Sequence, residues 1–275
     1  MSAGGPRVTA LGEHMRLVHG RHGHLLCNAH DRYVGQSLIR YGEFSELEWD
    51  VLKQLCHPGH VVAEVGANIG SHTVAIAKAV GPRGRVLAFE PQPAIFRTLC
   101  ANVALNELYN VECFQMGLGA APERITIPHY NYATEGNFGG IGLDQRDPKG
   151  VPVEINTLDA LFAGKRLNML KLDVEGMEAE VLKGARDTIA RCRPFMYVEN
   201  DRRDRSPALI TLVLELGYRA WWHRPRLYNP ANFFGEAENA FGNIVSINMF
   251  CTPAEHRVEM HGFAPVENPD DRPPG

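Results

Sequence analysis

Short apolar runs alternate with amphipathic segments from residue 60 onward, and this alternation constrains the fold more than any other feature of the sequence. Runs of this length separated by helix-length amphipathic segments are typical of strands joined by helices. The alternation predicts a parallel sheet with helices on both faces, a doubly wound α/β fold. Strands are predicted at 60–66, 84–91, 110–117, 167–176, 193–201, 218–224 and 244–252, and helices at 69–80, 93–108, 177–192 and 206–217.

The alternating region, taken as residues 41–255, is predicted to form one domain with a segment on either side. Residues 1–40 are expected to be a small N-terminal extension, and MRLVHG, HLLCNA and YVGQSLIRYG are predicted to be short strands with turns. Residues 256–275 end in ENPDDRPPG, a polar and proline-rich stretch that predicts a disordered tail.

A helix is predicted to begin at Ser45, ahead of the first strand of the sheet. Ser45 and Glu48 have the spacing of a capping box, in which each side chain satisfies a free backbone amide at the helix start. Leu47, Val51 and Leu55 continue the apolar face at helical spacing, and the HisProGly sequence that follows ends the helix.

The composition excludes several classes of protein. The chain of 275 residues carries a formal net charge of −4, whereas nucleic-acid-binding proteins usually present a basic surface. No run approaches the roughly 18 apolar residues of a membrane span, and the first residues lack the apolar stretch of a signal peptide. The 6 cysteines show no CxxC spacing, so we expect reduced thiols in a cytoplasmic protein.

Acidic residues follow the predicted strands at the point where each strand ends. Glu64, Glu90, Asp173 and Glu199 occupy four such strand ends. Ligands of open parallel sheets bind at the carboxyl ends of the strands. These carboxylates are therefore expected to converge on one binding site.

The first strand runs into a glycine turn, EVGANIG, where Gly66 and Gly70 permit a sharp turn and a close approach of a ligand to the backbone. Glu90 ends the next strand, where an acid accepts hydrogen bonds from a ribose diol in doubly wound folds. The third glycine of a dinucleotide site is missing, which favours S-adenosylmethionine, an adenosine compound without phosphate. The expected cofactor residues are Glu64, Gly66, Asn68, Gly70, Ser71, Glu90, Pro91, Met116, Gly117 and Asp173.

Three stretches, VVAEVGANIGSHTVAIA, LAFEPQP and LKLDVEGMEAEVLKGA, together resemble the FkbM-type methyltransferases, which use S-adenosylmethionine. The resemblance spans roughly residues 38–250 and implies a seven-strand Rossmann-like sheet whose last strand is antiparallel. It also implies methylation of a hydroxyl on a sugar, a glycan or a glycosylated natural product, with N-methylation of a peptide or amine as the alternative. Its most specific part is the K-x-D-V-E-G-x-E run, complete here as Lys171, Asp173, Val174, Glu175, Gly176 and Glu178.

Methyl transfer to an alcohol requires a group that removes the hydroxyl proton, or a metal ion that promotes its loss. Asp173 is the first candidate for this role, with Glu199 on the next strand and His72 as an alternative base. Lys171 is expected either to form an ion pair with Glu175 or Glu199, or to stabilise the alkoxide.

The same strand ends also indicate a candidate metal site, because Asp173, Glu199 and Asn200 offer hard oxygen ligands that suit Mg²⁺. Two loops rich in aromatic and amide side chains, 128–142 and 229–243, are expected to frame a small-molecule or glycan acceptor.

Two other classes of protein compete with a methyltransferase as interpretations of this sequence. One is a nicotinamide-dependent oxidoreductase, which the glycine spacing disfavours, and the other is a domain that binds the cofactor without catalysis. Whether the chain forms a homo-oligomer is left open.

Overall fold

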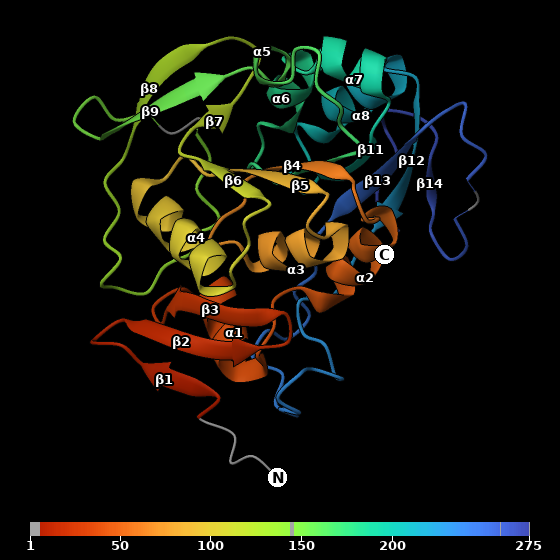
Figure 1. Ribbon diagram of the computed structural model, residues 1–275. Coiled ribbons are helices and arrows are strands. Elements are labelled where there is room, and N and C mark those ends of the chain that lie inside the picture. Colours follow the sequence, from red (N-terminus) through yellow and green to blue (C-terminus); the bar gives the residue numbers. More distant parts are fainter. Residues whose placement is uncertain (1–5, 144–145, 259, 275) are drawn as a thin grey trace.

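The structure, a computed structural model, describes residues 6–143, 146–258 and 260–274. Its centre is one mixed sheet of eight strands in the order β14-β12-β13-β11-β10-β4-β5-β6 (Figure 1). Their bounds are β4 (Val61–Val65), β5 (Arg85–Phe89), β6 (Val111–Phe114), β10 (Met169–Leu172), β11 (Phe195–Glu199), β12 (Tyr218–His223), β13 (Asn248–Pro253) and β14 (Pro265–Val266).

Strand directions agree with the predicted architecture. The strands β6, β5, β4, β10 and β11 are mutually parallel, and β13 lies antiparallel to both β11 and β12. The predicted doubly wound sheet with a reversed last strand is therefore confirmed, and β14 adds one short strand at the edge beside β12.

Helices cover both faces of this sheet (Figure 1). Alternate side chains of each strand point to opposite faces, so Val62 of β4 packs beneath α2 and α3 while Ala63 and Val65 pack with α5 to α8. One layer consists of α2 (Glu46–Leu55), α3 (Ser71–Val80) and α4 (Pro93–Leu105), and the other of α5 (Leu158–Leu161), α6 (Glu178–Lys183), α7 (Arg186–Cys192) and α8 (Ser206–Glu215).

Two small sheets flank the main one. The N-terminal sheet is antiparallel and consists of β1 (Val8–Ala10), β2 (Met15–Gly20) and β3 (Gly23–Asn28), followed by α1 (Val34–Tyr41). It packs next to α4 and α1 (Figure 1). The second small sheet contains β7 (Gly117–Leu118), β8 (Glu123–Ile127) and β9 (Val151–Asn156) in the order β7-β9-β8.

The prediction of a strand for YVGQSLIRYG is wrong, because this segment forms α1. Val34, Leu38 and Tyr41 are buried, and their spacing places them on one face of a helix. The helical period of these three side chains decides the structure, whereas the β-branched and aromatic content suggested a strand.

Two further predicted boundaries differ from the structure. The helix expected at 177–192 is divided into α6 and α7 at Gly184, where a Cβ would lie 2.0 Å from the carbonyl oxygen of Gly119. The expectation of a disordered tail does not hold for Pro265–Val266, which pairs with β12 as β14. Val266 is buried in the core beneath α8, and this burial fixes the segment.

No helix in the described ranges is long and apolar enough to cross a membrane. The cysteines agree with the expectation of unpaired thiols, since all six are free. Cys27, Cys56 and Cys251 are buried and pack as small apolar side chains.

Strand register brings the acidic strand ends together. Lys171 of β10 lies beside Glu64 of β4 on one side and beside Tyr197 of β11 on the other. Because side chains alternate along a strand, Asp173 follows Lys171 on the same face, and Glu199 follows Tyr197. Lys171 and Asp173 therefore form one row of side chains, and Tyr197 and Glu199 form a second. Both rows lie on the face covered by α2 and α3, at the carboxyl edge of the sheet.

Candidate active site

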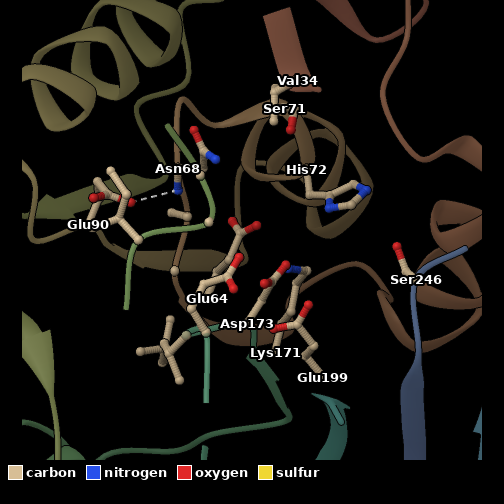
Figure 2. Close-up of a pocket in the computed structure, with 18 of the residues that line it drawn as sticks. Val34, Glu64, Asn68, Ser71, His72, Glu90, Lys171, Asp173, Glu199 and Ser246 are labelled. Carbon is tan, nitrogen blue, oxygen red and sulfur yellow. Dashed lines mark hydrogen bonds and ion pairs between the residues drawn. The ribbon is translucent and has the colours of Figure 1, made fainter. Parts of the chain in front are cut away.

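One cavity of about 240 Å³ opens at the carboxyl ends of β4, β5, β10 and β11 (Figure 2). Most residues predicted for a site line it, namely Glu64, Gly66, Asn68, Ser71, His72, Glu90, Pro91, Met116, Gly117, Lys171, Asp173 and Glu199. Gly70 and Asn200 are not among its lining residues. The edge of the sheet chosen from the sequence is therefore the one that carries the cavity.

The glycine turn after β4 brings the backbone to the wall of the cavity. Gly66 has a φ of 83°, and a Cβ there would lie 1.8 Å from the carbonyl oxygen of Asp173. The amides of Gly66 and Ala67 both donate to the carbonyl oxygen of Phe89, which ties β4 to β5 at this point. Only glycine fits at position 66, because the backbone that follows β10 passes directly over it. Gly70 does not line the cavity. It is the residue before α3, and its φ of 86° lets the chain turn into that helix.

Glu90 is fixed at the end of β5 by backbone amides. Asn68 N donates to its Oε2 at 3.1 Å (Figure 2), and Gln92 N donates to its Oε1 at 2.8 Å. Burial raises the pKa of this carboxyl to about 7, although the two amides oppose the shift. Each oxygen keeps a lone pair for a further donor, as binding of a diol requires.

Glu64 stands between the glycine turn and Lys171. The hydroxyl of Thr73 on α3 donates to its Oε2 at 2.6 Å. Burial raises the pKa of Glu64 to about 7, against the opposing effects of Lys171 and this hydrogen bond. An acid held in this way can switch between the neutral and charged forms near neutral pH.

Lys171 is a buried cation among carboxylates. Its side chain is 2% exposed, and its Nζ lies 3.0 Å from Asp173 Oδ2. Burial disfavours the charged form, but Asp173, Glu48 and Glu64 more than offset it, and the pKa of Lys171 is raised. The predicted ion pair with Glu175 or Glu199 is thus replaced by one with Asp173, two residues along the same strand face.

The turn after β10 accounts for the acids of the K-x-D-V-E-G-x-E run. Glu178 Oε1 accepts hydrogen bonds from Val174 N and Gly176 N, each at 3.1 Å, and so holds the turn in place. Glu175 has a φ of 55° and pairs with Arg202. Of the acids in the run, Asp173 is the one that pairs with Lys171 in the cavity.

The candidate metal site differs from the predicted one. Asn200 does not face the cavity, because its Nδ2 lies 3.4 Å from Met249 Sδ in the interior. Asp173, Glu175 and Glu199 instead offer oxygens that all lie within 4.8 Å of one another. Lys171 and Arg202 already neutralise two of these three carboxylates, so the group suits a divalent cation less well than a set of unpaired acids.

His72 and Glu199 present unpartnered polar atoms. His72 is 5% exposed and its Nε2 has no hydrogen-bond partner, while a hydrogen bond to the backbone of Ser45 holds the ring. Burial and the charge of Lys171 lower the pKa of His72 to about 3, so the ring is neutral at physiological pH. Glu199 Oε2 is also buried without a partner, and burial followed by the charge of Asp173 raises its pKa well above the usual range.

Glu48 is a site residue that the sequence reasoning missed. The capping-box interpretation is wrong for this side chain, because Ser45 Oγ donates to Glu48 Oε2 at 2.9 Å and Ser45 makes no side-chain cap. Glu48 is 4% exposed and lines the cavity from α2, and burial raises its pKa to about 7. Ser45, with a φ of 48°, thereby positions both Glu48 and His72.

The two predicted acceptor loops behave differently. The first contributes Asn137, Gly139, Gly140 and Ile141 to the cavity wall, but its aromatic rings Tyr132 and Phe138 pack against each other with centroids 4.9 Å apart.

No residue of 229–243 is among those that line the cavity. This segment packs on the N-terminal region instead, where Asn229 Nδ2 and Phe233 N both donate to the carboxylate of Glu43. Residues 244–247, directly after it, line the cavity together with Leu227. Ser246 lies on the opposite side of the cavity from Glu90, with Glu64, Asp173 and Glu199 between them (Figure 2).

The sheet with its reversed last strand, joined to a glycine turn and an acid at the end of the second strand, defines a Rossmann-like methyltransferase fold. A family model described as the methyltransferase FkbM domain matches residues 64–220. That match covers more than half of the chain, which therefore belongs to the FkbM methyltransferase domain family.

Curated relatives are similar over part of their length. Methyltransferase 1 of Beauveria bassiana is 31% identical over 146 residues, which are 46% of this chain and 58% of the relative. AMB antimetabolite synthetase AmbE of Pseudomonas aeruginosa is 30% identical over 204 residues, 58% of this chain and 10% of the synthetase. The chain therefore spans less than two thirds of each of these relatives.

Two solved structures are among those that superpose on part of this chain. The methyltransferase FkbM of Methylobacillus flagellatus superposes with a TM-score of 0.46 at 17% identity, over 70% of this chain and 43% of that one. The fibrillarin of Aeropyrum pernix in complex with S-adenosyl-L-methionine superposes with a TM-score of 0.45 at 14% identity, over 88% and 98% of the two chains.

Proposed function

We propose that this chain transfers the methyl group of S-adenosylmethionine to a hydroxyl of a small acceptor. One observation carries the proposal: a single cavity joins the glycine turn and Glu90 to a buried group of acids around Lys171. The first set suits adenosine and the second suits proton transfer from an alcohol. When bound, S-adenosylmethionine would supply an activated methyl on a sulfonium.

Glu90 would accept hydrogen bonds from both ribose hydroxyls, since two backbone amides hold its carboxylate in position. The backbone at Gly66 would pack against the methionine portion of the cofactor, because no side chain stands there. Glu64 would lie near the positive charge of the cofactor, which would favour the ionised form of its carboxyl.

Asp173 is the proposed acceptor of the hydroxyl proton. Its side chain is 38% exposed at the end of β10 and reaches into the cavity. The hydroxyl proton would pass to the Asp173 carboxylate as the acceptor oxygen takes the methyl group that S-adenosylmethionine supplies, leaving S-adenosylhomocysteine. Lys171 holds this carboxylate in position through their ion pair. His72 would not compete as base, because its pKa is near 3.

In a second version of the proposal, a divalent cation promotes loss of the hydroxyl proton. Asp173, Glu175 and Glu199 would be its ligands, in place of the set with Asn200. Because Lys171 and Arg202 already pair with two of these acids, we propose that turnover does not require Mg²⁺. EDTA is expected to leave turnover unchanged, and a loss that Mg²⁺ restores would establish the metal-dependent version instead.

A natural-product acceptor is favoured over a glycan. One relative is named an antimetabolite synthetase, and the aromatic rings that suggested sugar stacking pack against each other. N-methylation stays the alternative, because an amine would also fit beside the carboxylates. We also place the activity in the cytoplasm, in keeping with six free cysteines.

Calorimetry with two cofactor classes tests the proposal. S-adenosylhomocysteine is expected to bind with one site per chain, while NADH is expected not to bind because the turn lacks the glycine that a pyrophosphate needs. Tight binding of NADH without binding of S-adenosylhomocysteine would instead support an oxidoreductase. Release of S-adenosylhomocysteine from S-adenosylmethionine in the presence of an alcohol then separates a transferase from a domain that only binds.

A further inference from the structure

The far side of the cavity has a chemistry of its own. We call it the acceptor half and define it by Val34, Phe44, Glu48, His72, Glu199 and Ser246, which all line the cavity. Val34 and Phe44 form its apolar wall, and each of its four polar side chains can accept a hydrogen bond. An inference about its occupant rests on the proposed function, because it names the acceptor for the same site.

Acidic side chains outnumber basic ones around this cavity. Among the lining acids, Asp173 has Lys171 as a partner, and Glu175 and Asp201 share Arg202. Glu64 and Glu90 belong to the side proposed for the cofactor. Two acids of the acceptor half remain, Glu48 and Glu199, and the described residues place no cation within ion-pair distance of either.

Lys171 does not offer a free positive charge to an anionic acceptor. It is 2% exposed and is surrounded by Asp173, Glu48 and Glu64. A carboxylate or phosphate entering the acceptor half would meet Glu48 and Glu199 without a compensating cation. Burial of such an unpaired anion is strongly unfavourable.

His72 supplies the second, independent observation. His72 lines the cavity (Figure 2), its Nε2 is buried and unpartnered, and a hydrogen bond to the Ser45 backbone holds the ring. Neutral His72 therefore presents an acceptor, and Glu199 Oε2 presents another. The carboxyl group of Glu48 lines the same cavity, and a primary ammonium group has three N–H donors to share among such acceptors.

We propose that the acceptor is a small aliphatic amino alcohol whose protonated amine binds Glu48, Glu199 and His72 Nε2, while its hydroxyl faces Asp173. The apolar side chains Val34 and Phe44 would contact the carbon chain. A charge on the substrate would then satisfy buried acids that the protein itself leaves unpaired, which gives selectivity against neutral and anionic alcohols.

The test uses three probes of equal length, 3-amino-1-propanol, 1,3-propanediol and 3-hydroxypropanoate, each titrated into the protein saturated with S-adenosylhomocysteine. The amino alcohol is expected to bind at least tenfold more tightly than either of the others. Glu48→Gln and Glu199→Gln are each expected to reduce that preference about tenfold. Glu180→Gln removes an exposed acid that pairs with Lys183 and serves as the matched control, with no change expected.

Equal binding of the three probes would overturn the proposal, and so would an amine preference that survives in both variants. Binding of Mg²⁺ alone that is lost in Glu48→Gln would also overturn it, because a metal ion would then be the missing cation. Retained S-adenosylhomocysteine affinity in each variant shows that the chain is folded. Loss of S-adenosylhomocysteine binding by the unmodified chain would instead contradict the proposed function.

Discussion

The two halves of the cavity are built in different ways. The cofactor half is formed by strand ends and the turns that directly follow them, such as Gly66 and Glu90. The acceptor half is assembled from segments far apart in the sequence: Val34, the start of α2 at Glu48, and residues 244–247. The family model matches residues 64–220, so it includes the cofactor half together with His72 and Glu199, and leaves these three segments out.

The difference also appears in what holds each half together. Backbone hydrogen bonds across β4, β5 and β10 fix the cofactor half. The segments that flank the acceptor half are joined through a buried carboxylate, Glu43, which accepts from Arg21 Nε at 2.7 Å and from Asn229 Nδ2 and Phe233 N at 2.8 Å. A shared sheet can therefore bind the same cofactor while side chains outside it select the acceptor.

Asp173 lies where the two halves meet, and its substitution should have the largest effect. Asp173→Asn keeps the shape of the side chain but removes the base, so turnover should fall by about 10²–10⁴-fold. Cofactor affinity should change little, because the Asp173 side chain belongs to the step with the acceptor. Initial rates of S-adenosylhomocysteine release and calorimetry measure the two quantities. A fully active variant would move the search for the base to Glu199 and Glu64.

Glu90 tests the cofactor half alone. Glu90→Ala should lose roughly 1.5–3 kcal/mol of S-adenosylmethionine affinity, the value of hydrogen bonds to a charged group. The affinity for the acceptor, measured at saturating cofactor, should stay the same. Unchanged calorimetric affinity for the cofactor would remove the assignment of Glu90 to the ribose and blur the division of the cavity.

The cofactor half could be predicted from the sequence because its signals are local. Glu64, Gly66 and Glu90 each stand at or just after the end of an apolar run, and parallel strands bring such positions to one edge. The doubly wound sheet followed from the same alternation, and its antiparallel last strand from the family resemblance. The prediction of Asn200 as a metal ligand was wrong because a position at a strand end does not determine where the side chain points. The Asn200 side chain points toward Met249 in the interior.

Apart from His72 and Glu199, the acceptor half could not be predicted because its contacts are long-range. The spacing of Ser45 and Glu48 indicated a helix cap, and a local pattern has no information about Lys171, more than a hundred residues further on. In the same way, the aromatic residues of 229–243 suggested a sugar platform. Phe234 instead packs with the N-terminal region, which only the tertiary structure reveals.

Measuring the thermal stability of the chain as a function of pH tests a buried carboxyl from each half, Glu48 and Glu90. Burial raises the pKa of Glu48 and of Glu90 from 4.5 to about 7, so the folded chain binds more protons than the unfolded chain between these values. Stability should therefore fall as pH rises through this window, against the opposite effect of His72. We expect Tm to be on the order of 5 °C higher at pH 5.5 than at pH 7.5.

Glu48→Gln is the control for this titration, since the amide cannot titrate. The dependence of Tm on pH should become shallower in the variant, and calorimetric scans at several pH values measure the change. A slope identical to that of the unmodified chain would show that Glu48 is ionised throughout the range. In that case its carboxylate would need a cation that the described residues do not supply.

Hydrogen exchange should reveal the smallest effect and separate the two predicted acceptor loops. Residues 137–141 and 244–247 line the cavity, so their amides should exchange more slowly when S-adenosylhomocysteine and an acceptor are both bound. Residues 229–243 should show no change, because Glu43 and Tyr41 already hold this segment: Tyr41 donates to Glu238 O at 2.9 Å. Cofactor alone should protect 137–141 but not 244–247. Protection of 229–243 by the acceptor would mean that this segment closes over the cavity, and that the acceptor half extends beyond the residues that line it now.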